Sequence, residues 1–304
     1  MGTINEKLTY LNETKEAIKT AITNKGVTVE DADTFRSYAE KIDSIVGGAS
    51  IDTYIETSFE SSEKYIGTKA IKELPDFTYT GTSANTKLNT ERFFNGLRGL
   101  KIMPKIDFGT NRPSSFNYFF YDCQSLEDIS NLLELDTTDV ATCNYMFYNC
   151  FALTNIPEFD TGKSTTFNYF LYADNASSRY NLQSIAKLNF ESVINVANMF
   201  YTSTTDAYAN LTDLGGFENL GKAFTSTRSN YSNYTLNIKQ LTKLTYDSLM
   251  NIINNLYDLN LTYDVANGGT LYTQKIVLHA DCLGLLSDDE IAIATAKGWT
   301  VSTS

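Results

Sequence analysis

The stretch Tyr145-Met146-Phe147-Tyr148-Asn149-Cys150 is one of six related blocks in this sequence. The anchors that correspond to Phe147 in the other blocks are Phe94, Phe120, Leu171, Phe200 and Phe224, so the anchor returns every 24 to 29 residues. A period of this length indicates a repeat architecture, in which each unit buries its apolar face against its neighbours. Because such arrays offer long surfaces for recognition, we expect a binding protein rather than an enzyme.

Within each block, further apolar residues recur around the anchor. Around Phe147 they are Cys143, Met146 and Cys150, at four residues before, one before and three after. This spacing predicts one face of a short helix or helical turn. A leucine six residues after the anchor, followed by an apolar residue three further on, predicts a short strand. An Asp or Asn then follows, such as Asp136 or Asn189, which we expect to turn the chain by accepting nearby backbone N–H groups.

The run from Asp136 to Leu153 resembles the leucine-rich repeat of BspA-like proteins, and the resemblance extends over roughly residues 90–240. It implies a solenoid with a parallel β-ladder. The family includes bacterial surface adhesins, protist proteins and phage virion proteins, so the resemblance does not name a ligand. The expected fold class is α/β: a BspA-like leucine-rich-repeat solenoid with an N-terminal helical hairpin and a small α/β C-terminal cap.

Four segments follow from this pattern. We expect a helical attachment or oligomerisation module at 1–48, a cap region at 51–90, a solenoid of six units at 91–239 and a C-terminal cap at 240–304. In the cap, the pattern predicts a helix over 244–256, a strand that runs from 274 into His279, a helix that ends at 296–298, and a last strand at 299–301.

The sequence pattern of residues 1–48 predicts two amphipathic helices. The first starts in the capping box Thr3-Ile4-Asn5-Glu6 and ends before Lys25-Gly26. Their narrow apolar stripes bury little surface alone, so the hairpin should dock on another copy of the chain or on a larger particle. The apolar residues to which we assign attachment are Leu8, Leu11, Ile18, Phe35, Tyr38 and Ile42.

The runs 21–29 and 34–42 resemble the N-terminal segment of tail and other virion proteins of phages that infect gut and Gram-positive bacteria. The closing Lys297-Gly298-Trp299 is similar to the ends of phage tail proteins that carry these repeats. The resemblance implies a virion protein without catalytic residues, in a tail fibre, a baseplate or a head fibre. It would contact other virion proteins through residues 1–48, bind a host cell-surface protein or glycan, and form a homo-oligomer such as a trimer.

The amino-acid composition limits the classes of partner that the chain is expected to bind. The net charge of −12 and the pI near 4.6 disfavour nucleic acid and anionic membranes, whose phosphates bind clustered Lys and Arg. The sequence has no signal-peptide pattern and no run of 18 apolar residues, so we expect neither export nor a membrane span. This favours a virion protein assembled in the host cytoplasm over a secreted adhesin. The adhesin and a purely structural virion decoration protein stay open as alternatives.

Two groups of residues are candidates for binding. Units four to six carry insertions between the anchor and the following leucine, rich in Tyr, Ser and Asn, as in adaptable recognition loops. Their candidate residues are Arg179, Tyr180, Asp206, Tyr208, Arg228, Tyr231 and Tyr234. A weaker candidate is the tyrosine file beside the anchors, formed by Tyr121, Tyr148, Tyr172 and Tyr201. Solvated loops and tyrosines that cover the core are the alternative interpretations.

Catalytic motifs are missing from the sequence. The single histidine, His279, has no triad partner motif beside it, and no phosphate-binding loop or zinc-protease motif occurs. Carboxylates near the insertions, such as Asp206, leave a glycan depolymerase as a remote alternative. We expect no cofactor and no metal. Cys123 and Cys150 share one repeat position and should lie about 5 Å apart, which permits a disulfide, although an apolar column favours two buried thiols.

Overall fold

The computed structural model describes residues 4–23, 27–30, 71–78, 87–173, 179–203, 206–224, 235–261 and 274–304. The chain divides into two compact units, Met1–Glu60 and Ser61–Ser304, and each is described by itself. The structure contains both helices and short strands, as expected for a mixed α/β chain.

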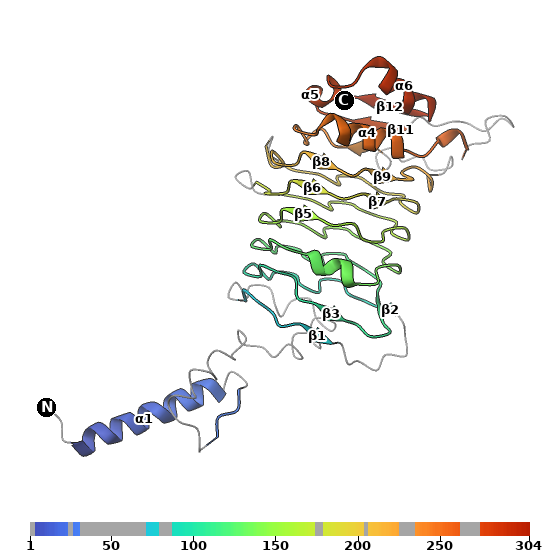
Figure 1. Cartoon of the computed structure of the whole chain (residues 1–304). Coiled ribbons are helices and arrows are strands. Elements are labelled where there is room, and N and C mark those ends of the chain that lie inside the picture. Colours follow the sequence, from blue (N-terminus) through green and yellow to red (C-terminus); the bar gives the residue numbers. More distant parts are fainter. Residues whose placement is uncertain are drawn as a thin grey trace. The chain divides into compact units, whose positions relative to one another are not determined.

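The first unit contains the helix α1 (Ile4–Thr23), shown in blue in Figure 1, which confirms the first of the two predicted helices. The N–H of Val27 donates to the carbonyl of Ile22 in the helix. Ile22 and Val29 are buried, with Ile18 and Val27 packed against them. The second predicted helix, with Phe35, Tyr38 and Ile42, lies outside the described residues, as do the side chains of Leu8 and Leu11.

The second unit contains turns of chain that lie one above another (Figure 1). Several turns carry strands of two residues that pair in parallel with a neighbouring turn, for example Asn155–Ile156 with Ser184–Ile185, and other turns are joined by isolated bridges such as Thr142 with Thr166. The paired strands are β1 (Phe77–Thr78) with β3 (Ile106–Asp107), β2 (Lys87–Leu88) with β4 (Arg112–Pro113), β5 (Asn155–Ile156) with β6 (Ser184–Ile185) and then β8 (Asp213–Leu214), and β7 (Leu188–Asn189) with β9 (Phe217–Glu218).

The anchor segments are not helical, and this corrects the expectation of a short helix or helical turn. Two residues before the anchor, φ is positive, at 55° in both Tyr118 and Tyr145. The backbone N–H groups of the first four anchors donate to the next turn, as from Phe94 to the carbonyl of Phe119 (2.8 Å) and from Phe147 to the carbonyl of Phe170 (3.0 Å), whereas Phe224 donates to Gly221 in its own turn. In an α-helix those N–H groups would donate to carbonyls four residues earlier in the same segment. Because the left-handed residues interrupt helical geometry, the N–H groups donate to carbonyls of the neighbouring turn instead.

The core lies inside the stack of turns. Phe94, Phe120 and Phe147 are fully buried, and their rings stack with centroids 5.4 and 5.6 Å apart. Cys123 and Cys150 are free thiols, and the prediction that both are buried is confirmed. The predicted Asp and Asn turns are also confirmed: each side chain accepts the N–H two residues further on. These residues are Asp107, Asp136, Asp160, Asn189 and Asn237.

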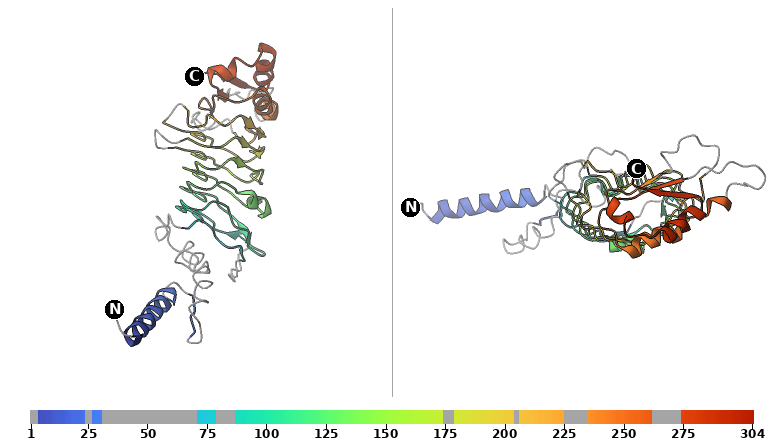
Figure 2. Two further views of the ribbon diagram at one scale, coloured as in Figure 1. Left: turned by 60° about the vertical axis from the view of Figure 1, so that its left-hand side comes forward. Right: turned by 90° about the horizontal axis from the view of Figure 1, so that it is seen from above.

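The C-terminal elements follow the stack. They comprise a parallel sheet of β10 (Leu236–Asn237), β11 (Gln274–Val277) and β12 (Trp299–Ser302), and the helices α4 (Tyr246–Asn255), α5 (Ala280–Leu283) and α6 (Asp288–Ala296). Figure 2 shows α4 and the neighbouring sheet covering the end of the stack. The predicted helices over 244–256 and up to 296–298 and the strand at 299–301 are confirmed. His279 is not in a strand, because it caps the N-terminus of α5.

The described residues also form two short 3-10 helices, η1 (Ser130–Glu134) and η3 (Leu259–Leu261). The Ser248 hydroxyl on α4 accepts from the N–H of Leu214 (2.9 Å), which ties the helix to β8 at the end of the stack. None of the helices in the described ranges has the length and apolar character that a membrane crossing requires.

Candidate binding surface

The insertions of units four and five contribute side chains to the core as well as to the surface. Arg179 and Asp206 are exposed, and the Arg179 guanidinium lies 3.5 Å from the Asp206 carboxylate and 3.0 Å from its carbonyl oxygen. Tyr180 and Tyr208 are completely buried. The prediction that these two tyrosines bind a partner at the surface is therefore wrong. Arg228, Tyr231 and Tyr234 lie outside the described residues.

Burial of Tyr180 and Tyr208 has a clear physical reason. Their rings stack 5.1 Å apart, which adds aromatic area to the buried core. Their hydroxyls find polar partners in the backbone, at 2.7 Å from the carbonyl of Tyr172 for Tyr180 and at 2.8 Å from the carbonyl of Leu171 for Tyr208. Because the hydroxyls are satisfied, burial of both rings carries no unpaired polar group.

A second set of tyrosines lies on the anchor segments. These tyrosines form two files, which together we call the tyrosine surface. One file lies one residue after the anchors and the other two residues before them. The members are Tyr121, Tyr148, Tyr172 and Tyr201, and Tyr118, Tyr145 and Tyr169. Tyr201 is 42% exposed and Tyr148 only 7%, whereas the other five are half-buried.

The rings of the tyrosine surface follow the spacing of the turns. Tyr118 and Tyr145 stack at 4.9 Å and 4°, and Tyr145 and Tyr169 at 4.9 Å and 19°. This distance equals the spacing of neighbouring strands, so one ring per turn produces a continuous stack. The Arg92 guanidinium lies 4.6 Å above the Tyr118 ring and ends the file with a cation–π contact.

Backbone strain accompanies the file before the anchors. Tyr118, Tyr145 and Tyr169 have φ of 54° to 55°, a left-handed conformation that is rare for bulky residues. The cost is on the order of 1 kcal/mol per residue, and ring stacking offsets a comparable amount. The corresponding residues of the first and fifth units, Arg92 and Asn198, have φ of 62° and 55°, so this conformation belongs to the repeat and does not depend on tyrosine.

Burial, and then the neighbouring Tyr118 and Tyr169, raise the pKa of the Tyr145 hydroxyl, so this phenol stays protonated at neutral pH. The surface offers aromatic faces and hydroxyl groups. A partner that suits it has apolar or C–H faces and hydrogen-bonding groups, which fits a sugar or a protein segment.

The described residues contain no cluster of three His, Cys, Asp or Glu side chains that could hold a metal ion. The His279 ring accepts the N–H of Asp281 at Nδ1 (3.2 Å) and lies 3.6 Å from the Asp281 carboxylate. Of the carboxylates near the insertions, Asp206 is paired with Arg179. This arrangement is typical of polar surface and does not by itself assemble a catalytic group.

Sequence reasoning missed the internal role of Tyr180 and Tyr208, although a signal for it exists. In units two and three, the residue three after the anchor is Cys123 or Cys150, whose thiol donates to the preceding anchor's carbonyl (3.0 Å in both). Unit five has Ser203 at this position. Loss of the cysteine in a unit with an insertion indicates that a donor must come from the inserted residues.

Residues 114–235 match a family model described as "Mycoplasma protein of unknown function, DUF285". The match includes the last five anchors and all seven members of the tyrosine surface. No curated protein and no solved structure matches the chain. The chain is thus similar to this family over its central part, and the family's description supplies no activity.

Proposed function

We propose that this chain is a non-enzymatic binding protein that recognises its partner through the tyrosine surface. The stack of turns would be a solenoid of the leucine-rich-repeat class, similar to BspA-like proteins. The observation that carries the proposal is the stacking of half-buried tyrosines on successive turns, with ring centroids 4.9 Å apart.

We place this protein on a phage virion, in a tail fibre, a baseplate or a head fibre. Support comes from the resemblance of the runs 21–29 and 34–42 to virion proteins. The helix α1 and the small cluster of Ile18, Ile22, Val27 and Val29 suit an attachment module, since so small a core needs a partner for stability. The first 48 residues would contact other virion proteins or further copies of the chain.

The partner class we favour is a host cell-surface glycan or protein, because stacked phenol rings suit both. A bacterial surface adhesin would use the same tyrosine surface, and a decoration protein would use it against another virion subunit. These alternatives differ in what the purified chain binds.

The test is binding of the purified full chain to intact cells of candidate host bacteria, with competition against phage adsorption. We expect saturable binding that blocks adsorption, and a loss of binding in Tyr145→Ala and Tyr169→Ala. Tyr246→Ala is the matched control, because Tyr246 is 44% exposed and lies outside the tyrosine surface. Thermal unfolding of each variant shows whether the stack is intact.

Two treatments of the cells identify the partner class. Loss of binding after periodate oxidation indicates a glycan, and loss after proteolysis indicates a protein. If the chain binds no host that the phage infects but binds purified virion subunits, the structural alternative replaces the proposal. If all three tyrosine variants bind equally well, the tyrosine surface is not the recognition site.

A further inference from the structure

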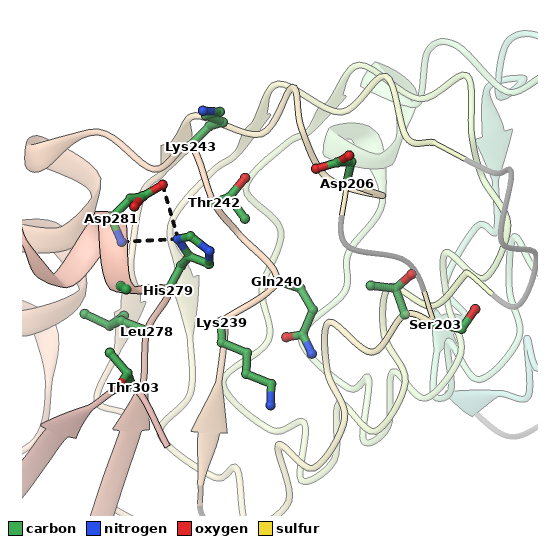
Figure 3. Close-up of a pocket in the computed structure, with 12 residues that line it drawn as sticks. Ser203, Asp206, Lys239, Gln240, Thr242, Lys243, Leu278, His279, Asp281 and Thr303 are labelled. Atoms are coloured by element: carbon green, nitrogen blue, oxygen red, sulfur yellow. Dashed lines mark hydrogen bonds and ion pairs between the residues drawn. The ribbon is translucent and has the colours of Figure 1, made fainter.

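A cavity of about 600 Å³ lies where the fifth turn meets the C-terminal elements (Figure 3). One side is formed by Thr202, Ser203 and Asp206, and the other by residues of the segments 239–243 and 278–281. This volume is within the range of small-molecule sites, which begins at roughly 300 Å³. The lining is dominated by hydroxyl, amide and charged side chains, which favours a polar ligand.

Two lysines line the cavity, Lys239 and Lys243. Both are exposed, and neither ammonium group forms an ion pair within the described ranges. Of the carboxylates in the lining, Asp206 lies 3.5 Å from the Arg179 guanidinium, and Asp281 lies 3.6 Å from the His279 ring. The two ammonium groups are therefore available to an anionic ligand.

His279 adds a directed donor to these cations. Because the N–H of Asp281 donates to Nδ1, the proton of the neutral imidazole lies on Nε2. Figure 3 shows Nε2 on the side of the ring that points away from Asp281. The N-cap role of His279 in α5 holds the ring in this orientation.

We propose that this cavity binds an anionic, hydroxyl-bearing unit, that is, a sugar or polyol that carries a carboxylate or a phosphate. The flexible stems of Lys239 and Lys243 allow both ammonium groups to reach the anion, and Nε2–H of His279 donates to it. Gln240, Thr242 and Asp206 face the hydroxyl groups. The cavity shares no lining residue with the tyrosine surface, so the proposal stands whether or not that surface binds a partner.

The test is a titration of the ¹⁵N-labelled full chain, followed by NMR, with two matched pairs of ligands. D-Glucuronate is compared with D-glucose, and glycerol 3-phosphate with glycerol, because each pair differs mainly in the anionic group. We expect at least one anion to bind at least about tenfold more tightly than its neutral counterpart, the factor that one charge-assisted hydrogen bond supplies.

Variants localise the site. We expect Lys239→Gln and Lys243→Gln each to weaken binding of the anion about tenfold. Lys72→Gln should leave it unchanged, because Lys72 is an exposed lysine at the other end of the stack and does not line the cavity. Tighter binding of glucuronate supports a sugar carboxylate, and tighter binding of glycerol 3-phosphate supports a polyol phosphate.

Three results would overturn the proposal. They are binding of neither anion, equal binding of an anion and its neutral counterpart, and an equal effect of the three lysine variants. Since the tyrosine variants do not alter the cavity, anion binding that persists in Tyr145→Ala separates this proposal from the proposed function.

Discussion

The hydroxyl of Tyr208 donates a hydrogen bond of 2.8 Å to the backbone carbonyl of Leu171, the anchor of the preceding turn. In the earlier turns a thiol plays the same part, from Cys150 to the carbonyl of Phe120. The carbonyls of the first four anchors thus form a column inside the stack, and each accepts a hydrogen bond from a side chain of the following turn. Where an insertion replaces the cysteine, a buried tyrosine supplies that donor.

Tyr208→Phe should lower the free energy of unfolding by about 1–3 kcal/mol, because a buried carbonyl loses its donor while the ring stays in place. Chemical denaturation in urea measures this change. Tyr201→Phe is the control, since Tyr201 is 42% exposed, and it should change the free energy of unfolding by less than about 0.5 kcal/mol. Equal effects of the two substitutions would contradict the donor role.

Alkaline pH should weaken the fold. Burial raises the pKa of the Cys143 thiol to about 12, from 9.0 in an unperturbed thiol, and burial also raises the pKa of Tyr180 and Tyr208 well above the usual 10.0. Above pH 9 the unfolded chain therefore releases protons that the native chain keeps. The free energy of unfolding should be highest below pH 9 and fall as the pH rises toward 12.

Urea unfolding at a series of pH values tests this dependence. Cys143→Ala should reduce the slope between pH 9 and about 10, because one of the groups that titrate differently is removed. A free energy of unfolding that stays constant through this range would show that the thiols and phenols are not protected by burial.

Gly221→Ala should lower the free energy of unfolding by about 2–3 kcal/mol. Gly221 has a φ of +105°, and an added Cβ would lie 2.7 Å from Trp299 and 2.9 Å from Leu259. The Trp299 ring cannot move aside freely, because its indole N–H donates to the carbonyl of Tyr257 (3.0 Å). Thermal unfolding and the fluorescence of this single tryptophan report the change.

Gly109→Ala is the matched control, since Gly109 has a φ of +60° and no atom within 4 Å of the added Cβ. It should show only the backbone cost, about 1 kcal/mol. If Gly221→Ala is no worse than Gly109→Ala, the close approach to Trp299 does not limit this site.

Asp139→Asn should destabilise the chain at neutral pH. The hydrogen bond and charge of Lys163, together with Lys87, lower the pKa of the Asp139 carboxyl below 3.8. A depressed pKa stabilises the fold at pH values above that of the unfolded carboxyl and loses this contribution as the pH falls through the native pKa. The difference between Asp139→Asn and the unsubstituted chain should therefore shrink below about pH 4.

Glu127→Gln is the comparison for Asp139→Asn, because Glu127 forms an exposed pair with Lys101 at 3.2 Å. Exposed pairs contribute about 0–1 kcal/mol, so this substitution should have a small effect at every pH. A pH-independent effect of Asp139→Asn would show that its ion pairs do not stabilise the fold.

Local sequence signals predicted several elements correctly. The capping box Ser287–Glu290 marks the start of α6, because a cap depends on residues only three positions apart. The Asp and Asn turns follow for the same reason, as in Asp107, whose carboxylate accepts the N–H of Gly109. His279 shows the limit, because apolar neighbours predict a strand where its ring in fact caps α5.

The sequence by itself determined the period of the chain, the positions of the buried anchors and the presence of α4 and α6. These features depend on apolar spacing and on residues close together in the chain. Only the tertiary structure decided that the anchor segments bond between turns rather than as helices, and that Tyr180 and Tyr208 point inward. The partners in those contacts include carbonyls of a neighbouring turn, such as Phe147 for Tyr180 and Leu171 for Tyr208, which are more than 20 residues away, so no local pattern contains them.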